Sequence, residues 1–181
     1  MRNIKKAVEV VIAEGAHAQG VMCYTTSPVH TLEKFLQMGE EIEAMGGEAM
    51  SNGGSVTEYE QMEKMVADAK QKWGGVHILL NNAGVLRDKT FAKMSLEDFQ
   101  LVMDVHLMGT VNCTRACWEI MKEQGYGRVV VTTSSSGLYG NFGQTNYGSA
   151  KMGVIGLMNT LVQEGAKYDI RVNALAPTAG T

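Results

Sequence analysis

The sequence has few cysteines, no cluster of basic residues and no long apolar run. Its three cysteines form neither a metal-binding nor a redox motif, and this sparse, odd-numbered use of thiols is typical of a reducing cytoplasm. A formal net charge of -3 without a Lys/Arg-rich stretch argues against nucleic-acid binding. The apolar stretches are too short to span a membrane, and no apolar block of a secretory signal follows the first residues. We therefore expect a cytoplasmic protein without nucleic-acid or membrane partners.

Metal-ligand spacing is also lacking. His17 and His30 have no third histidine or paired carboxylate at a suitable separation, so we interpret both as polar loop or cap residues. Cys113 and Cys117 lie four residues apart, on one face of an expected helix, where buried free thiols are the simpler interpretation. No metal site is predicted.

Apolar periodicity predicts helices and strands in alternation along all 181 residues. Helices are expected at 2–14, about 28–45, 58–73, 95–124 and 147–167. Strands are expected at 20–25, 76–80, 129–131 and 170–176, with an ambiguous edge strand at 48–55. The alternation implies right-handed crossovers between parallel strands. We predict one α/β domain over residues 1–181, with a doubly wound, mostly parallel, five-stranded, Rossmann-like sheet in three αβα layers.

Three side chains near the fourth expected strand suggest proton transfer. Ser134 lies just after the apolar run 129–131, and Tyr147 and Lys151 lie four residues apart in the following helix. That spacing places the phenol and the ammonium on one helical face. A helix-capping serine and a surface lysine remain the alternative interpretation of the same residues.

From about residue 47 onward, the chain resembles the short-chain dehydrogenase/reductase family. Three motifs carry the resemblance: Asn81-Asn82-Ala83-Gly84, Ser134 with Tyr147-x-x-x-Lys151, and the run 171–177 that ends in Pro177. Within the family, residues 136–144 look like the (3R)-hydroxyacyl-CoA dehydrogenase part of peroxisomal multifunctional enzymes. His106 agrees with that subgroup, since this position usually holds asparagine in the wider family.

The resemblance implies specific catalytic roles. Tyr147 would be the general acid/base, and the Lys151 ammonium would favour its phenolate form. Ser134 would donate a hydrogen bond to the substrate carbonyl oxygen, with Ser135 and Ser136 as alternatives. His106 is included as a fourth catalytic candidate.

The resemblance also implies a cofactor and partners. NAD or NADP would contact Asn81, Ala83, Gly84 and Pro177, and also Tyr147 and Lys151, whose ammonium would hold the nicotinamide ribose. The substrate would be a small molecule such as a 3-hydroxyacyl thioester. Helices 95–124 and 147–167 would pair across a homodimer or a higher homo-oligomer, as they do in this family.

The first part of the chain departs from the family. No Gly-rich turn of the kind that meets a pyrophosphate occurs before residue 47. Thr25 and Thr26 stand where an acidic residue is expected, and Ser55 stands where the family tends to have aspartate. Cofactor binding is therefore expected to be weakened, with the helix amides after Ser27-Pro28 as a substitute phosphate site.

Residues 1–46 resemble another family. The runs 15–20 and 24–32 are similar to one helix-strand-helix piece of the carboxyltransferase TIM barrel of pyruvate carboxylase and oxaloacetate decarboxylase. The lysine-containing strand that this chemistry needs is absent, so no carboxyltransferase activity is expected. A chimera joined near residues 45–47 would explain both resemblances, and 47–181 would be a truncated short-chain dehydrogenase-like core. We prefer the arrangement in which the strand at 20–25 takes the central position, so that the strand order, numbered along the chain, becomes 2-1-3-4-5; the alternative second position would leave buried backbone groups unpaired.

Three functions remain open on the sequence. The first is an oxidoreductase that transfers hydride between a nicotinamide cofactor and a hydroxyl or carbonyl substrate, impaired by the missing loop. The second is a non-enzymatic chimeric or remnant domain that keeps the Ser/Tyr/Lys set without binding cofactor. The third is a carboxyltransferase-like binding fragment.

Overall fold

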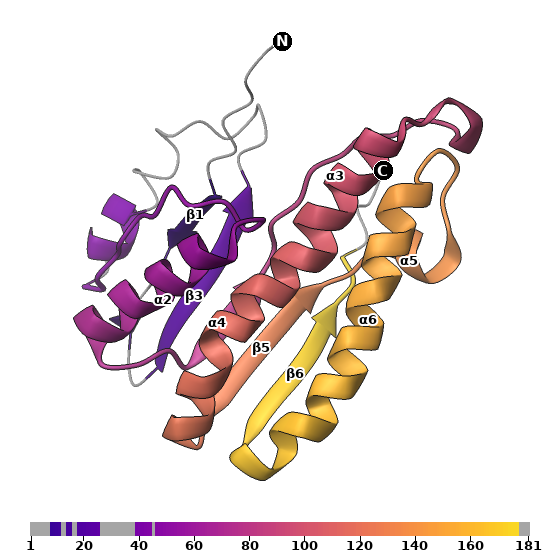
Figure 1. Cartoon of the computed structure of the whole chain (residues 1–181). Helices are drawn as coiled ribbons and strands as arrows, with labels where there is room; N and C mark the ends of the chain where they lie inside the picture. Colours follow the sequence, from indigo (N-terminus) through magenta and orange to yellow (C-terminus); the bar gives the residue numbers. More distant parts are fainter. Residues whose placement is uncertain (1–7, 12–13, 16–17, 26–38, 45, 178–181) are drawn as a thin grey trace.

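One sheet runs through the whole molecule (Figure 1). The computed structural model describes residues 8–11, 14–15, 18–25, 39–44 and 46–177. Its strands are β1 (Val8–Val11), β2 (Glu14–Gly15), β3 (Ala18–Thr25), β4 (Ile78–Asn81), β5 (Gly127–Thr132) and β6 (Ile170–Leu175). The strand order is β1-β3-β4-β5-β6, and β2 pairs with β3 off this path.

The last four strands are parallel, and the first two are not. β3 pairs with β4, β4 with β5 and β5 with β6, all in parallel register. β1 and β2 both run antiparallel to β3. The predicted mostly parallel α/β sheet is therefore confirmed, with an antiparallel edge at the amino-terminal side.

Two details of the predicted sheet are wrong. The segment 48–55 forms no strand, and the sheet has six strands instead of five. Side chains satisfy backbone groups of this segment locally: Gly54 N donates to Asn52 Oδ1 at 2.8 Å, and Thr57 N donates to Ser55 Oγ at 3.3 Å. Such bonds compete with a strand ladder. β3 does take the place beside β4, as preferred from the sequence, but its other neighbour is β1.

The predicted helix at 2–14 is also wrong over its described residues. Residues 8–11 and 14–15 are strands that pair with β3, in the register Val8↔Thr25 and Glu14↔Gln19. The apolar run is short, and short runs do not distinguish the two periods. Valines at positions 8, 10 and 11 favour the extended backbone once a neighbouring strand is available. Of the helix predicted at about 28–45, residues 39–44 are helical and 28–38 and 45 lie outside the described residues.

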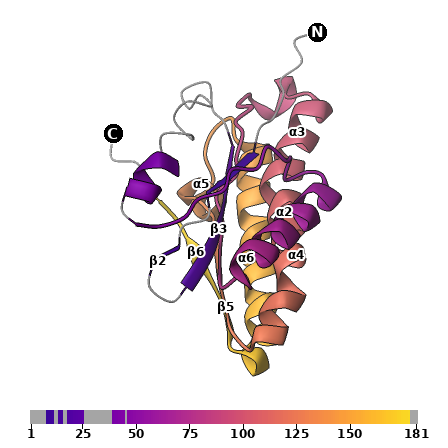
Figure 2. The same ribbon diagram turned by 90° about the vertical axis from the view of Figure 1, so that its left-hand side faces the viewer.

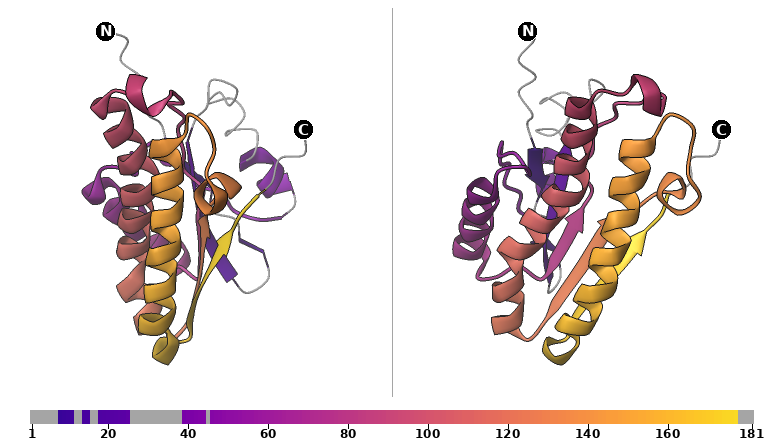
Figure 3. Two further views of the ribbon diagram at one scale, coloured as in Figure 1. Left: turned by 90° about the vertical axis from the view of Figure 1, so that its right-hand side faces the viewer. Right: turned by 45° about the vertical axis from the view of Figure 1, so that its right-hand side comes forward.

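Helices cover the sheet unevenly, as Figures 2 and 3 show. They are α2 (Tyr59–Trp73), α3 (Leu96–Met103), α4 (Gly109–Gln124), α5 (Ser135–Tyr139) and α6 (Thr145–Gly165). The longer helices α2, α4 and α6 lie on one face, and the short helices 39–44 and α5 lie on the other. Helices on both faces agree with the predicted three layers.

The helix predicted at 95–124 is continuous but changes its winding. Ser95 caps it as expected, since Ser95 Oγ accepts a hydrogen bond from Asp98 N at 3.1 Å. A single π-helical turn, Asp104–Met108, joins α3 to α4. Gly109 lies directly after it, and a side chain there would meet Val56 Cγ2 at 2.7 Å. Such π-turns are frequent at functional sites, and this one contains His106.

The core lies between the sheet and the three longer helices. Its buried members come from α2, α4, α6 and the inward positions of β4, β5 and β6. They include Met62, Met65, Leu79, Cys113, Cys117, Met121, Val129, Val131, Val154, Ile170 and Val172. The two thiols predicted to be buried are buried. Among the described residues, no helix is long and apolar enough to cross a membrane.

Candidate active site

The candidate site lies where the parallel strands end. The carboxyl ends of β3, β4, β5 and β6 share one edge of the sheet, and ligands of open α/β sheets bind at that edge. Two hydrogen bonds tie the strand ends together. Thr132 Oγ1 donates to Asn82 Oδ1 at 3.1 Å, and Thr133 N donates to Leu175 O at 2.8 Å. The loops that leave these strands therefore start from a fixed frame.

Ser134 leaves β5 in extended conformation and begins α5. Its φ and ψ are -160° and 156°, and its Oγ accepts a hydrogen bond from Ser136 N at 3.2 Å. The capping role of Ser134 is thus confirmed, whereas the surface position of Lys151 that belonged to the same interpretation is wrong, because Lys151 is only 4% exposed. Capping uses the hydroxyl as an acceptor and leaves its O–H as a donor. The structure is therefore compatible with the catalytic interpretation as well.

Glycine lets α5 lie directly against α6. A Cβ at position 137 would meet Lys151 Cβ at 2.8 Å and the backbone N of Met152 at 3.1 Å. Thr133 Oγ1 also donates to the Lys151 carbonyl at 2.7 Å. The segment that carries Ser134 is therefore held close to the helix that carries Tyr147 and Lys151.

Tyr147 and Lys151 share one face of α6, as the spacing predicts. The Lys151 Nζ lies 5.5 Å from the centre of the Tyr147 ring. Lys151 is only 4% exposed, and its ammonium donates to the Thr132 carbonyl at 2.6 Å. Burial without a carboxylate lowers the Lys151 pKa to about 8. A buried cation of this kind stabilises negative charge that develops nearby.

His106 also contacts the tyrosine. The two rings meet edge to face, with centroids 5.0 Å apart and an interplanar angle of 88°. His106 Nε2 lies 2.8 Å from Val85 O and 3.1 Å from Val85 N, and the shorter contact favours an Nε2–H that donates to the carbonyl. Its Nδ1 is buried without a hydrogen-bond partner among the described residues.

His106 is neutral in this position. Burial, together with the smaller effect of the nearby Lys151 charge, lowers the pKa of His106 to about 4. The residue is 4% exposed. At neutral pH it therefore presents an uncharged ring edge to Tyr147 and an acceptor lone pair on Nδ1.

The predicted cofactor residues fall into two groups. Gly84 lies against His106, where an added Cβ would approach the ring Cε1 to 2.5 Å, and Ala83 precedes it in the same loop. Pro177 is exposed two residues after β6, at the same edge of the sheet. Asn81 instead points into the helical layer, where its Nδ2 donates to Thr114 Oγ1 on α4 at 3.1 Å. Its Oδ1 is buried without a partner among the described residues.

Three residues that shape the site escaped the sequence interpretation. Thr132 and Thr133 connect the end of β5 to β4, β6 and Lys151. Asn146, directly before Tyr147, is completely buried and contacts the loop after β4. Their only signal in the sequence is position: two hydroxyls precede the serines, and an amide precedes the tyrosine.

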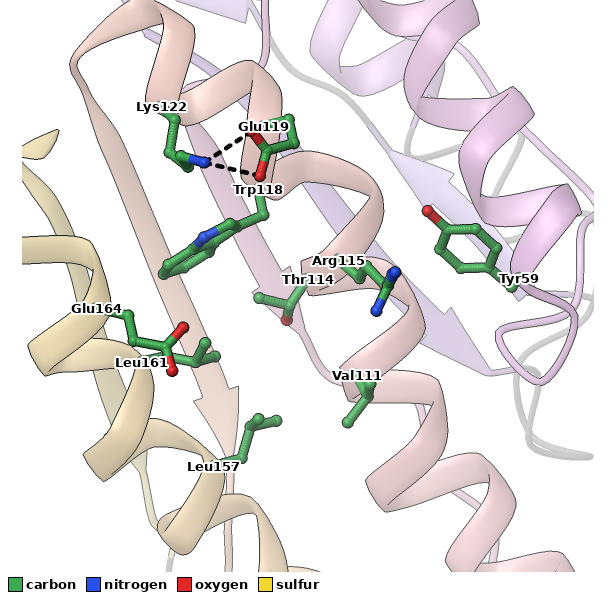
Figure 4. Close-up of a pocket in the computed structure, with 10 residues that line it drawn as sticks. All are labelled: Tyr59, Val111, Thr114, Arg115, Trp118, Glu119, Lys122, Leu157, Leu161 and Glu164. Atoms are coloured by element: carbon green, nitrogen blue, oxygen red, sulfur yellow. Dashed lines mark hydrogen bonds and ion pairs between the residues drawn. The ribbon is translucent and has the colours of Figure 1, made fainter.

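A separate hollow lies on the outer helical face (Figure 4). It is formed between α4 and α6, with Tyr59 of α2 at one end. Its lining consists of Tyr59, Val111, Thr114, Arg115, Trp118, Glu119, Lys122, Leu157, Leu161 and Glu164. Since it does not include Ser134, Tyr147 or Lys151, this hollow is distinct from the candidate active site.

Comparison with known proteins agrees with this geometry. The family model of short chain dehydrogenase matches residues 7–180. The chain is 53% identical over 141 residues to a short-chain type dehydrogenase/reductase of Mycobacterium tuberculosis, covering 78% of this chain and 49% of that protein. It is 48% identical over 141 residues to peroxisomal multifunctional enzyme type 2 of Mus musculus, covering 78% of this chain and 19% of that protein. The chain thus spans about half the length of the first relative.

A solved structure of a short chain dehydrogenase is also similar to this chain. The crystal structure of a short chain dehydrogenase from Mycobacterium avium superposes with a TM-score of 0.75 at 37% identity, covering 80% of this chain and 53% of that one. Members of this family generally use NAD or NADP. Together, the strand-end site and these matches show that the chain belongs to the short-chain dehydrogenase family.

Proposed function

We propose that the chain is an oxidoreductase that interconverts a hydroxyl and a carbonyl group with a nicotinamide cofactor. The observation that supports this most directly is that the Tyr147 ring lies close to both the buried Lys151 ammonium and the neutral His106 ring. A phenol beside a buried cation and at the ligand-binding edge of a parallel sheet is suited to proton exchange.

Each residue then has a distinct task. Tyr147 gives its phenolic proton to the carbonyl oxygen during reduction and takes it back during oxidation. Lys151 stabilises the phenolate, and Ser134 donates a hydrogen bond to the same substrate oxygen. The cofactor, when bound, supplies or accepts the hydride.

The residues fit the nicotinamide end of such a cofactor. An ammonium carries three N–H donors, and Lys151 uses one of them on Thr132 O. The remaining donors suit the hydroxyl oxygens of a ribose. The pyrophosphate of the cofactor lacks its usual binding loop here, because the sequence has no Gly-rich turn before residue 47. β3 ends at the edge where the pyrophosphate would lie, and residues 26–38, which follow it, are outside the described residues.

Cofactor titration tests the proposal. NADH and NADPH are titrated into the protein by fluorescence and calorimetry. We expect saturable binding that Lys151→Met weakens by about tenfold or more, because a hydrogen bond to a charged group contributes about 1.5–3 kcal/mol. Lys64→Met, at an exposed lysine of α2 that pairs with Asp68, is the matched control and should bind like the wild type. Absence of binding at millimolar cofactor would overturn the proposal and favour a non-enzymatic domain.

For the substrate, we propose a 3-hydroxyacyl thioester. The support is the similarity to peroxisomal multifunctional enzymes and the apolar side chains near the site. Leu138, Tyr139 and Phe142 are exposed on and after α5, where they would contact an acyl chain. A comparison of short and long acyl thioesters under identical conditions checks this, with the longer chain expected to have the lower KM.

We also propose that two copies pair through α4 and α6. Trp118, Leu157 and Leu161 present apolar surface in the hollow of Figure 4. Pairing of these helices with those of a second copy would remove that surface from water.

A further inference from the structure

Asn146 is a buried polar residue for which the proposed reaction has no role. Its side chain is 0% exposed, and it lies in the first turn of α6, directly before Tyr147. Both ends of its amide are used. Oδ1 accepts a hydrogen bond from Tyr147 N at 2.7 Å, and Nδ2 donates to Arg87 O at 3.0 Å. A weaker contact joins Nδ2 to Asp98 O at 3.5 Å.

One of these bonds satisfies a backbone N–H group at the start of α6. The first backbone N–H groups of a helix have no partner within the helix. Gln144, in the N-cap position of α6, makes no side-chain capping bond. Asn146 supplies the missing acceptor from inside the helix, and the group it satisfies is the backbone N–H of Tyr147 itself. The position of the tyrosine backbone therefore depends on this amide.

The same amide joins α6 to the loop that follows β4. That loop contains Ala83 and Gly84, and it is held at two carbonyls by buried side chains. His106 donates to Val85 O, and Asn146 donates to Arg87 O. Two further bonds join the loop to the start of α6: an exposed one from Gln144 Nε2 to Asp88 Oδ2 at 2.8 Å, and a backbone one from Lys89 N to Gly143 O at 2.9 Å. Exposed hydrogen bonds compete with water, so the buried Asn146 amide contributes more than they do to the fixed distance between α6 and this loop.

We propose that Asn146 is a positioning residue that fixes Tyr147 relative to the loop after β4. It does not reach the reacting atoms. It acts by holding the start of α6, so that the Tyr147 ring keeps its place beside His106 and Lys151. The proposal rests on the proposed oxidoreductase function for its kinetic consequence, but not for its structural one.

The structural test needs no activity. The ring resonances of Tyr147 are recorded in protein with ¹³C-labelled tyrosine and assigned by their loss in Tyr147→Phe. Asn146→Ala should move them from their wild-type positions, because the ring loses its fixed place beside His106. Asn112→Ala is the matched control: Asn112 Nδ2, on α4, also donates to a backbone carbonyl, Val56 O at 2.9 Å. It should leave the Tyr147 resonances unchanged.

The kinetic test separates positioning from general destabilisation. We expect Asn146→Ala to lower kcat by about 10- to 100-fold, as small displacements of a reacting group do. The urea midpoint should fall further than in Asn112→Ala, because two buried backbone groups lose their partner, so kcat is compared under conditions where both variants are fully folded, and the cofactor Kd should stay near the wild-type value. If Asn146→Ala does not fold, Asn146→Asp replaces it, since it keeps the volume and the acceptor but loses the donor to Arg87 O. The Asp variant is expected to show the same resonance shifts and kcat loss.

The outcomes distinguish the two proposals. Wild-type protein without cofactor binding would defeat the proposed function, and the resonances of Tyr147 would still decide the role of Asn146. Unchanged Tyr147 resonances in Asn146→Ala, or equal kcat in Asn146→Ala and Asn112→Ala, would overturn the positioning role.

Discussion

The imidazole of His106 meets the phenol ring of Tyr147 edge to face, with the ring centroids 5.0 Å apart. The two residues come from different elements, the π-turn between α3 and α4 and the first turn of α6. Because His106 is also bonded to Val85, this contact connects the loop after β4 with the proposed proton donor. The geometry of the site is thus shared among three segments.

The phenol is the first group to remove. Tyr147→Phe keeps the ring that contacts His106 and deletes only the hydroxyl. We expect carbonyl reduction to fall by about 10²- to 10⁴-fold, the usual contribution of a general acid, with little change in cofactor Kd. Steady-state kinetics and calorimetry measure the two effects. Tyr126→Phe, at the opposite edge of the sheet, is the control, and unchanged reduction by Tyr147→Phe would show that the activity comes from another site.

The buried histidine predicts an acid sensitivity of the fold. Its folded-state pKa of about 4 lies below the ordinary 6.5. As pH falls from 6.5 toward 4, the unfolded chain therefore binds a proton that the folded chain does not, and stability is lost. This group should lower the free energy of unfolding by about 2 kcal/mol between pH 7 and pH 5.

Urea unfolding at the two pH values measures this effect. In His106→Asn the difference between pH 7 and pH 5 should be smaller than in the wild type by that amount. Asn112→Ala should keep the wild-type difference, because it removes no titrating group. If the free energy of unfolding changed equally between pH 7 and pH 5 in wild type and His106→Asn, His106 would not be the group responsible for the acid sensitivity.

Gly84 should not tolerate a side chain. The Cβ of Gly84→Ala would approach His106 Cε1 to 2.5 Å, and the ring cannot retreat easily because it is held by Val85 and Tyr147. We expect a loss of about 1–3 kcal/mol in the free energy of unfolding, typical of overpacking. Gly53→Ala is the control, since a Cβ there meets nothing within 4 Å.

A double variant identifies the cause of that loss. In a His106→Ala background, Gly84→Ala should cost markedly less, because the atom it meets is gone. Equal costs in both backgrounds would mean that the strain lies elsewhere.

The apolar side chains between α4 and α6 predict self-association. Leu161→Lys places a charge in the hollow of Figure 4 and should convert a dimer to a monomer, measured by size-exclusion chromatography with light scattering. Phe91→Lys, at a residue that is 74% exposed in the 3-10 turn Phe91–Lys93, should leave the assembly unchanged. A monomeric wild-type protein would count against the pairing.

The carboxyl-terminal part of the fold could be predicted because each signal is local. Helix α2 has the buried face that its periodicity indicates, namely Met62, Met65, Val66 and Ala69. Ser95 caps where expected, and Gly125 ends the long helix in left-handed conformation with φ of 64°. Tyr147 and Lys151 share a face because a helix of any protein gives that result at a spacing of four. Local rules were sufficient for these elements.

The amino-terminal part could not be predicted, because its structure depends on a partner strand. Valines 8, 10 and 11 are compatible with a helix or a strand, and pairing with β3 stabilises the strand. The segment 48–55 does not form the predicted strand, because its own side chains, and not a partner strand, satisfy its backbone groups. The edge position it was expected to fill belongs to β1 instead.

The sequence by itself determined which groups are present at the site: a serine at a strand end, a phenol and an ammonium on one helical face, and a histidine within the helix predicted at 95–124. Tertiary structure alone decided their state. Burial beside Thr132 O lowers the Lys151 pKa to about 8, and burial near that cation keeps His106 neutral. Desolvation and neighbouring charge depend on residues far apart in the chain, so no local pattern specifies them.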